Sequence, residues 1–275
     1  MTAHDLANVL AGRLKAVPGV QAVALGGSWA RGAGDAHSDV DLGLYYASRR
    51  PPNIDRVRAV AATVDPAATV TGLGEWGPYI NGGAWLTVDG QRVDWLYREL
   101  DAVETAVAMA EQGQLRMAYQ PGHPHGFLSV GYAAELHHAV VLRDATGRLG
   151  ALKSRVVSYP QALSEAFMGL LWEADFSLDM ADKVAARGDV VHVAGLAYRA
   201  VACAAHALHA ANGSWCYSEK RAVADVDRLP RRPQGFATEL RRVFARLGDS
   251  PQELAVTLKR LRRVVADVRT LCPRA

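Results

Sequence analysis

The chain is poor in cysteine, has no strong excess of either charge and lacks long apolar runs. Its three cysteines lie far apart, with neither a CxxC pair nor a histidine at zinc spacing, so no disulfide framework or zinc site is predicted. A net charge of +3 in 275 residues neither indicates nor excludes nucleic acid. No run approaches eighteen apolar residues, and the first apolar stretch contains Asp5 and Arg13, unlike a signal peptide. We therefore expect a cytoplasmic protein without a membrane segment.

Half of the residues are hydrophobic, and the spacing of these residues along the chain changes near residue 120. The first part mixes helix and strand periodicities, and the second reads almost entirely as helix. We expect an α/β (α+β) domain with a mixed sheet over residues 1–120 and an all-α helical domain over 121–275. The elements expected in the first are helices 4–16, 53–64 and 100–112, strands 20–25, 40–46 and 67–71, and a hairpin of 84–88 with 91–97. Those expected in the second are helices 129–140, 148–157, 160–184, 189–212, 218–228, 235–247 and 251–271.

The most informative segment is Gly26-Gly27-Ser28, followed after a short gap by Asp39-Val40-Asp41. Asp39 and Asp41 point the same way from an extended strand, because side chains alternate faces with period two. Two close carboxylates repel each other unless a cation lies between them, and Mg²⁺ favours carboxylate oxygens together with substrate phosphates. The glycine turn supplies backbone N–H groups and a hydroxyl for a phosphate. The segment therefore predicts a metal-assisted nucleotide site.

A third carboxylate, Asp94, lies in an otherwise apolar strand of the predicted hairpin. The hairpin is indicated by Asp89-Gly90, the preferred pair for a two-residue turn. A carboxylate in an apolar strand is rare without a partner. Its partner is either a cation of the chain, such as Arg92, or the metal ion predicted above.

Together these residues resemble the nucleotidyltransferase superfamily, which includes DNA polymerase beta. The match covers residues 20–98 and rests on Gly26, Gly27, Ser28, Asp39, Asp41 and Asp94. The resemblance implies that residues 1–120 form the nucleotidyltransferase domain and that Asp39 and Asp41 hold one or two Mg²⁺ ions. It also implies that Asp94 completes the second metal site or acts as the base toward the acceptor hydroxyl.

Further nucleotide contacts are expected from Arg31, Tyr217 and Lys220. Arg31 follows the glycine turn, where a guanidinium is suited to clamp a triphosphate. Antibiotic adenylyltransferases and poly(A) polymerases place a Tyr and a Lys of the helical domain over the triphosphate, and Tyr217 and Lys220 look similar. We expect Lys220 in the first turn of helix 218–228, where a cation opposes the helix dipole and so suggests a ligand.

The resemblance to aminoglycoside and other antibiotic adenylyltransferases implies transfer of AMP from ATP to a hydroxyl of a small molecule. A polycationic acceptor would need further acids, for which Glu75, Glu135, Glu165 and Glu173 are available, and Glu173 is an alternative base to Asp94. The sequence leaves the acceptor, the nucleotide base and the oligomeric state open.

Two other functions remain open at this stage. One is a toxin-like nucleotidyltransferase acting on tRNA or protein, because twelve Lys/Arg against six Asp/Glu follow from Asp225 onward. Its footprint would be Arg241, Arg242, Arg246, Lys259, Arg260, Arg262 and Arg263. The other is a non-catalytic nucleotide-sensing module, against which the complete set of three acids argues.

Overall fold

The computed structural model describes residues 1–272 and divides into two units, each with its own hydrophobic core. The first unit comprises Met1–Met109 and Arg116–Val157. The second comprises Ala110–Leu115 and the chain from Ser158 onward. Residues 121–157, which we assigned to the helical half, thus belong with the first unit. The reason is that β8 (Val140–Asp144) pairs with β1 (Ala22–Leu25) and so adds an edge to the sheet.

The first unit is built on a six-stranded mixed sheet of order β3-β4-β5-β2-β1-β8. The remaining strands are β2 (Val40–Tyr46), β3 (Thr69–Val70), β4 (Gly83–Val88) and β5 (Gln91–Glu99). Only the central pair, β2 and β5, is parallel, and all other neighbours are antiparallel. The mixed sheet predicted from the sequence is confirmed, as is the hairpin about Asp89-Gly90, where both turn residues have positive φ.

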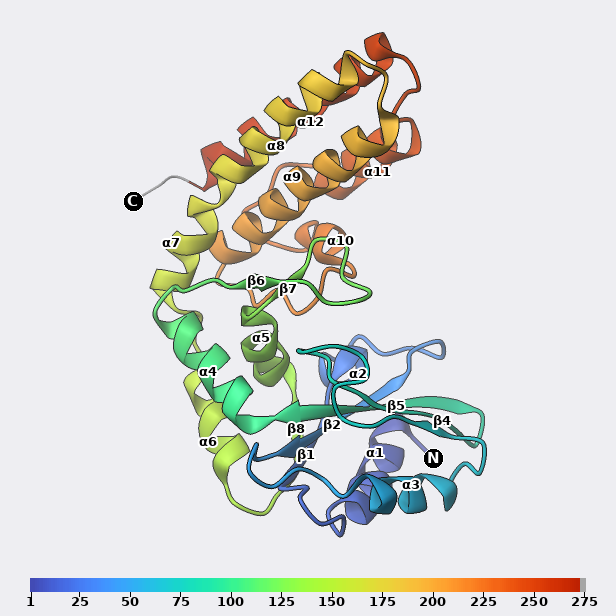
Figure 1. Ribbon diagram of the computed structural model, residues 1–275. Coiled ribbons are helices and arrows are strands. Elements are labelled where there is room, and N and C mark those ends of the chain that lie inside the picture. The colour runs from blue at the N-terminus through green and yellow to red at the C-terminus, as the bar shows by residue number, and fades with distance from the viewer. Residues whose placement is uncertain (273–275) are drawn as a thin grey trace. The chain divides into compact units, whose positions relative to one another are not determined.

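One face of this sheet is apolar and is covered by α1 (Ala3–Leu14) and α3 (Ile54–Ala62) (Figure 1). Asn53 begins α3 as its N-cap, as predicted, because its side chain accepts a hydrogen bond from the Arg56 N–H. Alternate residues of the central strands supply the core: Val40, Leu42, Leu44 and Tyr46 on β2, and Val93, Trp95 and Tyr97 on β5. The intervening residues, including Asp41 and Asp94, therefore project from the opposite face.

The elements beside that second face were only partly predicted. They include α2 (Gly27–Ala30), α5 (Val130–His138) and a small hairpin of β6 (Met117–Ala118) and β7 (Phe127–Leu128). Helices α4 (Leu100–Glu111) and α6 (Arg148–Arg155) complete the elements that begin in this unit. The short strands β6, β7 and β8 were not predicted from the sequence.

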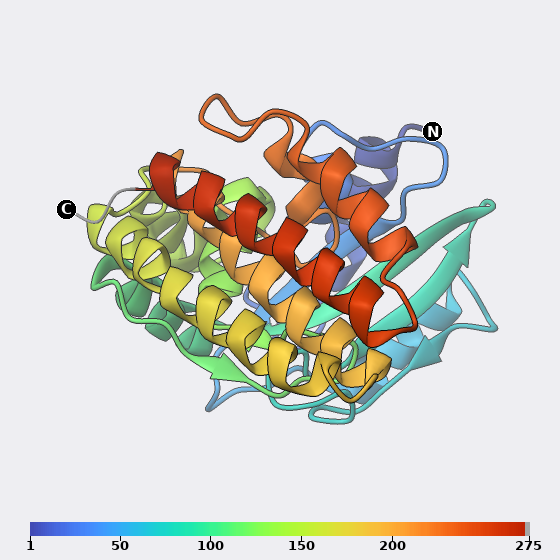
Figure 2. The same ribbon diagram turned by 90° about the horizontal axis from the view of Figure 1, so that it is seen from above.

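The described elements of the second unit are helices. They are α7 (Gln161–Gly169), α8 (Leu171–Ala185), α9 (Val190–Ala211), α10 (Ala222–Val226), α11 (Phe236–Ala245) and α12 (Pro251–Leu271). Helices α8, α9 and α12 lie side by side, as both views show (Figures 1 and 2). The single helix predicted over 160–184 was wrong, since Leu170 ends α7 and begins α8.

Helix α9 is long and apolar enough, by length and composition alone, to cross a membrane. More than half of the apolar stretch is buried within the structure, and residues such as Val193, Ala197 and Leu208 belong to the core of the second unit. This burial is typical of the central helix of a helical domain.

Candidate active site

Three carboxylates meet on the second face of the sheet, at the central parallel pair of strands. Asp41 on β2 lies directly opposite Asp94 on β5 in the register. Asp39 precedes β2 by one residue and shares the face of Asp41. Neighbouring strands lie about 4.8 Å apart. We call Asp39, Asp41 and Asp94 the acid row.

The glycine turn predicted to bind phosphate packs directly against Asp41. The Gly26 N–H donates a 2.8 Å hydrogen bond to the Asp41 carbonyl. Gly27 has φ +62°, and a Cβ added there would lie 1.8 Å from Asp41 Oδ2. Both the left-handed backbone and the close approach exclude a side chain at position 27. The turn and the acid row are thus parts of one local structure.

Burial and neighbouring charges make Asp41 hard to ionise. Desolvation is the largest cause, followed by the negative charges of Asp94, Glu135 and Asp39, and together they raise the pKa of Asp41 from 3.8 to about 7. Arg98 opposes the shift. Near neutral pH the carboxyl therefore holds a proton for much of the time, which means that the acid row needs positive charge in order to be fully ionised.

A buried ion pair lies on the same face of the sheet, further along β5 than Asp94, and was not recognised from the sequence. Arg98, on β5, donates from Nη2 to Glu135 Oε2 at 2.8 Å and from Nε to Glu135 Oε1 at 2.9 Å. Only 4% of the Arg98 side chain and 11% of the Glu135 side chain are exposed. Burial by itself lowers the pKa of Arg98, but the Glu135 charge and the bidentate hydrogen bonds to Glu135 outweigh it and raise the pKa. Glu135 is therefore occupied within the chain, and the role foreseen for it, binding a polycationic acceptor, is not supported.

Asp39 is paired with a cation of the chain. Arg92 Nε lies 2.6 Å from Asp39 Oδ1, with 66% of the arginine side chain exposed. Arg92 thus pairs with Asp39. Among residues 1–272, no group of three or more His, Cys, Asp or Glu side chains is arranged to hold a metal ion.

The donor chemistry of the acid row nevertheless suits a hard cation. Carboxylate oxygens are the ligands that Mg²⁺ prefers, and a cation beside Asp41 would offset the burial and the neighbouring negative charges that raise its pKa. A metal held by all three acids requires Asp39 to exchange Arg92 for the ion. An exposed ion pair contributes only about 0–1 kcal/mol, so this exchange costs little.

The other predicted phosphate contacts of the first unit follow the glycine turn. Ser28 lies in α2, whose N-cap is Gly26. Arg31 is the C-cap of the same short helix, and its N–H bonds back to the Ser28 carbonyl at 3.2 Å. Both residues are half-buried. They lie within a few residues of the segment that contacts Asp41.

The structure corrects the local setting of Lys220 in the second unit. Residues 219–221 form a bend and turn, Arg221 has φ +67°, and α10 begins only at Ala222. Lys220 is exposed and precedes the helix, so the argument from the helix dipole was wrong. Ser218 Oγ accepts a hydrogen bond from the Lys220 N–H at 3.1 Å, which accounts for the turn. Nucleotide contact by Tyr217 and Lys220 stays a prediction.

Several charged side chains of the second unit are occupied within the unit. Glu173, the alternative base, is bound by Arg199 Nε. Arg260 pairs with Glu239 at 2.7 Å, and Arg262 pairs with Asp179 and Asp182. These pairs neutralise part of the basic surface on which the RNA alternative depends. No disulfide joins the cysteines within residues 1–272, and burial raises the pKa of Cys203 to about 12 and that of Cys272 to about 11, as in structural thiols.

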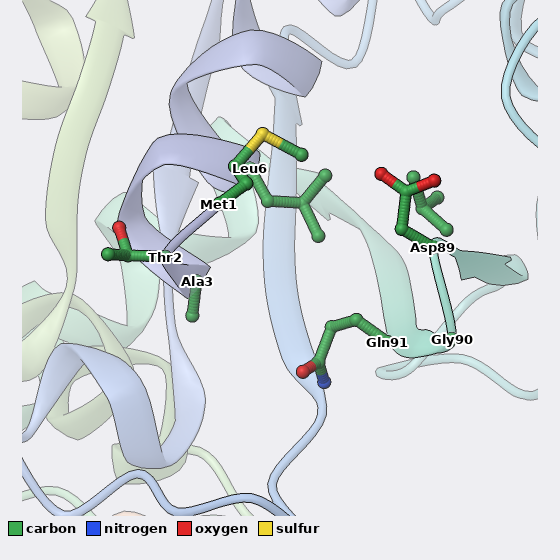
Figure 3. Close-up of a pocket in the computed structure, with 8 residues that line it drawn as sticks. Met1, Thr2, Ala3, Leu6, Asp89, Gly90 and Gln91 are labelled. Atoms are coloured by element: carbon green, nitrogen blue, oxygen red, sulfur yellow. The ribbon is translucent and has the colours of Figure 1, made fainter.

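A cavity of about 300 Å³ lies beside the turn of the β4–β5 hairpin. It is formed by the first residues of the chain and by the turn, including Leu6, Asp89 and Gln91 (Figure 3). None of the three acids lines it. This cavity offers no carboxylate cluster and no glycine turn, and we assign it no part in the chemistry.

Comparison with known proteins gives little to add to this geometry. No protein-family model matches the chain, and no curated protein matches it. Among solved structures, a nucleotidyltransferase-like protein from Exiguobacterium sibiricum is similar, with 10% identity over 94% of this chain and 74% of that chain. The TM-score is 0.44, a likeness too distant to support an argument about this protein.

Proposed function

We propose that the protein is a cytoplasmic nucleotidyltransferase that transfers a nucleoside monophosphate, AMP from ATP, to a hydroxyl of a small molecule. The observation that supports this best is the acid row, with Asp41 opposite Asp94 on adjacent parallel strands and Asp39 two residues from Asp41. The glycine turn packed against Asp41 adds a phosphate-binding element at the same place.

Asp39, Asp41 and Asp94 would hold one or two Mg²⁺ ions. Such ions, when bound, neutralise charge on the triphosphate and on the attacking and leaving oxygens. Asp41 then loses its proton, because the cation supplies the positive charge that the acid row requires. Gly26, Gly27 and Ser28 would bind phosphate oxygens through their N–H groups and the hydroxyl, and Arg31 would pair with the same group.

In the transfer itself, the acceptor hydroxyl oxygen forms a bond to the α-phosphorus. The bond from that phosphorus to the bridging oxygen breaks, and pyrophosphate leaves with the electron pair. The hydroxyl proton passes to a carboxylate within hydrogen-bond reach, for which Asp94 is our assignment. Asp94 lies on β5, at the edge of the acid row. Asp39 and Asp41, next to and on β2, are therefore assigned to the nucleotide.

The role of the second unit rests on Tyr217 and Lys220, and one substitution tests it. Lys220→Ala should weaken binding of an ATP analogue about tenfold, because charged hydrogen bonds to phosphate contribute about 1.5–3 kcal/mol. Isothermal titration calorimetry measures this change directly. Lys259→Ala removes another exposed lysine of the same unit and should leave the affinity unchanged. Equal affinities for wild type and Lys220→Ala would remove Lys220 from the site.

The decisive experiment for the whole proposal is calorimetric titration of each non-hydrolysable NTP with and without Mg²⁺. We expect magnesium-dependent binding of the ATP analogue that is lost in Asp39→Asn. Asp65→Asn, which changes a carboxylate outside the acid row, is the matched control and should bind as wild type does. Absence of binding by every NTP would contradict the proposal and favour the non-catalytic alternative.

A further inference from the structure

The second unit contains a cavity of about 350 Å³ that is bordered by α9, α10 and α11. We call it the α11 cavity. Its lining comes from α9, from the turn before α10, from α10 itself and from α11. Neither the acid row nor the glycine turn lines it, and neither Tyr217 nor Lys220 does. The cavity therefore shares no lining residue with the proposed nucleotide site.

Most of the lining of the α11 cavity is apolar. These side chains come from all three helices: Val201, Val223, Ala224, Ala237, Leu240 and Phe244. The residues contributed by α11 recur at helical spacing, so they form one stripe along that helix. Phe244 remains 37% exposed, although an aromatic ring is costly to leave in water. An apolar group bound in the cavity would cover this surface.

Two arginines line the same cavity. Arg241 belongs to the apolar stripe of α11 and is exposed, and within residues 1–272 its side chain makes no ion pair and no hydrogen bond. Arg221 donates from Nη2 to Asp225 at 3.3 Å, which uses one of the five N–H donors of a guanidinium. A guanidinium presents these donors in a planar fork that matches a carboxylate. Donors for an anion thus lie beside the apolar lining.

Glu219, the acid of the lining, is engaged by a neighbouring hydroxyl. The Tyr198 hydroxyl donates to Glu219 Oε2 at 3.1 Å. Burial and the Glu219 charge raise the pKa of Tyr198 to about 12, so the hydroxyl keeps its proton. The lining therefore carries two positive charges against one negative charge, and the negative charge is hydrogen-bonded within the lining. This balance favours an anion over a cation as the ligand.

The backbone at Arg221 does not favour an arginine. Its φ of +67° lies in the left-handed region, where glycine is the least strained residue. The exposed i,i+4 pair with Asp225 contributes little stability. Local structure thus gives weak reason for this side chain, whereas a ligand in the cavity would use its remaining donors.

We propose that the α11 cavity binds a small organic carboxylate, whose apolar body lies among Val201, Leu240 and Phe244 and whose carboxylate pairs with Arg241 and Arg221. The cavity volume suits a ligand of about a dozen non-hydrogen atoms, because one water occupies about 30 Å³ of liquid. This second ligand site belongs to the second unit alone and does not depend on the proposed function.

The test is isothermal titration calorimetry of the full-length protein with 4-phenylbutyrate, which has about the required size. We expect one site with a Kd below about 1 mM. The uncharged 4-phenylbutanamide should bind about tenfold more weakly, because it lacks the charge that pairs with the arginines. Butyrate keeps the carboxylate without the ring and should also bind at least about tenfold more weakly.

Two neighbouring arginines of α11 provide a matched pair of variants. Arg241→Gln should weaken binding of 4-phenylbutyrate about tenfold. Arg242→Gln makes the same change at an exposed residue that does not line the cavity, and it should leave the Kd unchanged. Ala224→Leu should also weaken binding, because the larger side chain occupies part of the cavity.

Arg221→Gly separates ligand binding from folding. It removes the side chain where the backbone favours glycine, so the midpoint of thermal unfolding should stay within about 3 °C of wild type. Binding of 4-phenylbutyrate should nevertheless be weaker than in wild type.

Three outcomes would overturn the proposal. The first is a wild-type Kd for 4-phenylbutyrate above about 1 mM. The second is equal affinity for the carboxylate and its amide, which would show that the arginines do not select an anion. The third is an equal effect of Arg241→Gln and Arg242→Gln, which would place the ligand outside the α11 cavity.

Discussion

Asp41→Asn is expected to abolish nucleotidyl transfer and, at pH 8, to raise the stability of the protein. The loss of activity should be about a hundredfold to a thousandfold or more, because an amide provides neither the charge nor the second oxygen for a metal ion. The stability gain has a separate cause. Burial and the neighbouring acids raise the pKa of Asp41 to about 7, so its ionised form is unfavourable in the folded protein.

The sign and the pH window of the effect follow from linkage. The pKa of Asp41 is about 7 when folded and 3.8 as an ordinary value, so the folded state binds the proton more tightly. Between about pH 4 and 7 the wild-type protein therefore loses stability as pH rises, and above that range the loss is constant. Asparagine does not ionise. The advantage of Asp41→Asn should be absent below pH 4, partial at pH 5 to 6, and about 2–4 kcal/mol at pH 8.

Thermal unfolding of wild type and Asp41→Asn at pH 4, 6 and 8, without added Mg²⁺, measures this dependence. Asp39→Asn is the matched control: the same change in the same row, at a carboxylate that is partly exposed and paired with Arg92. It should lose activity without the stability gain. Mg²⁺ should stabilise only the wild-type protein. If the stability gain of Asp41→Asn does not depend on pH, or if Asp41→Asn is less stable than wild type at pH 8, ionisation of the buried Asp41 does not destabilise the folded protein and this prediction is wrong.

Glu135→Gln is expected to destabilise the protein by about 3–5 kcal/mol, the largest stability effect that the structure predicts. The change leaves the Arg98 guanidinium buried without its counter-charge, and breaking a buried pair from one side costs about this much. One of the two bonds that link α5 to β5 is lost as well, because an amide keeps only one acceptor oxygen. The neighbouring Asp41 should then ionise more easily, because Glu135 raises its pKa and Arg98 lowers it.

Urea unfolding at pH 7 measures the change in the free energy of unfolding. The double variant Arg98→Met/Glu135→Leu removes both charges and should recover most of the loss, since replacing a whole buried pair by apolar groups is often neutral. Asp55→Asn breaks the exposed pair of Asp55 with Arg58 and should cost less than about 1 kcal/mol. Glu135→Gln within 1 kcal/mol of wild type would show that Arg98 is satisfied by other groups or by water.

The sequence predicted the parts of the acid row because local rules generate them. Alternation along a strand places Asp39 with Asp41, and an apolar strand makes Asp94 conspicuous. The same rules contained more than we extracted. Counting back from Asp89-Gly90 pairs Val88 with Gln91 and therefore Trp85 with Asp94, as the structure has it. The aromatic neighbour of the acid row was thus accessible from the hairpin alone.

Other features depend on side chains that meet from distant parts of the chain. Arg98 and Glu135 look like ordinary surface charges in the sequence, and only the packing of α5 makes them a buried pair. The predicted position of Lys220 in the first turn of a helix was wrong for a different reason. A turn stabilised by Ser218 and a left-handed Arg221 delays α10 to Ala222, and helix signals do not locate a boundary to within a few residues.

The sequence by itself determined the strands that carry the acid row, the turn between β4 and β5, and the side of each strand on which the acids project, because a strand has a period of two residues and a tight turn needs particular residues. Only the tertiary structure decided that β2 and β5 are parallel neighbours, which puts Asp41 opposite Asp94, and that β8 extends the same sheet. Pairing between distant strands is selected by how their apolar faces pack against α1 and α3, and that choice involves the whole first unit at once.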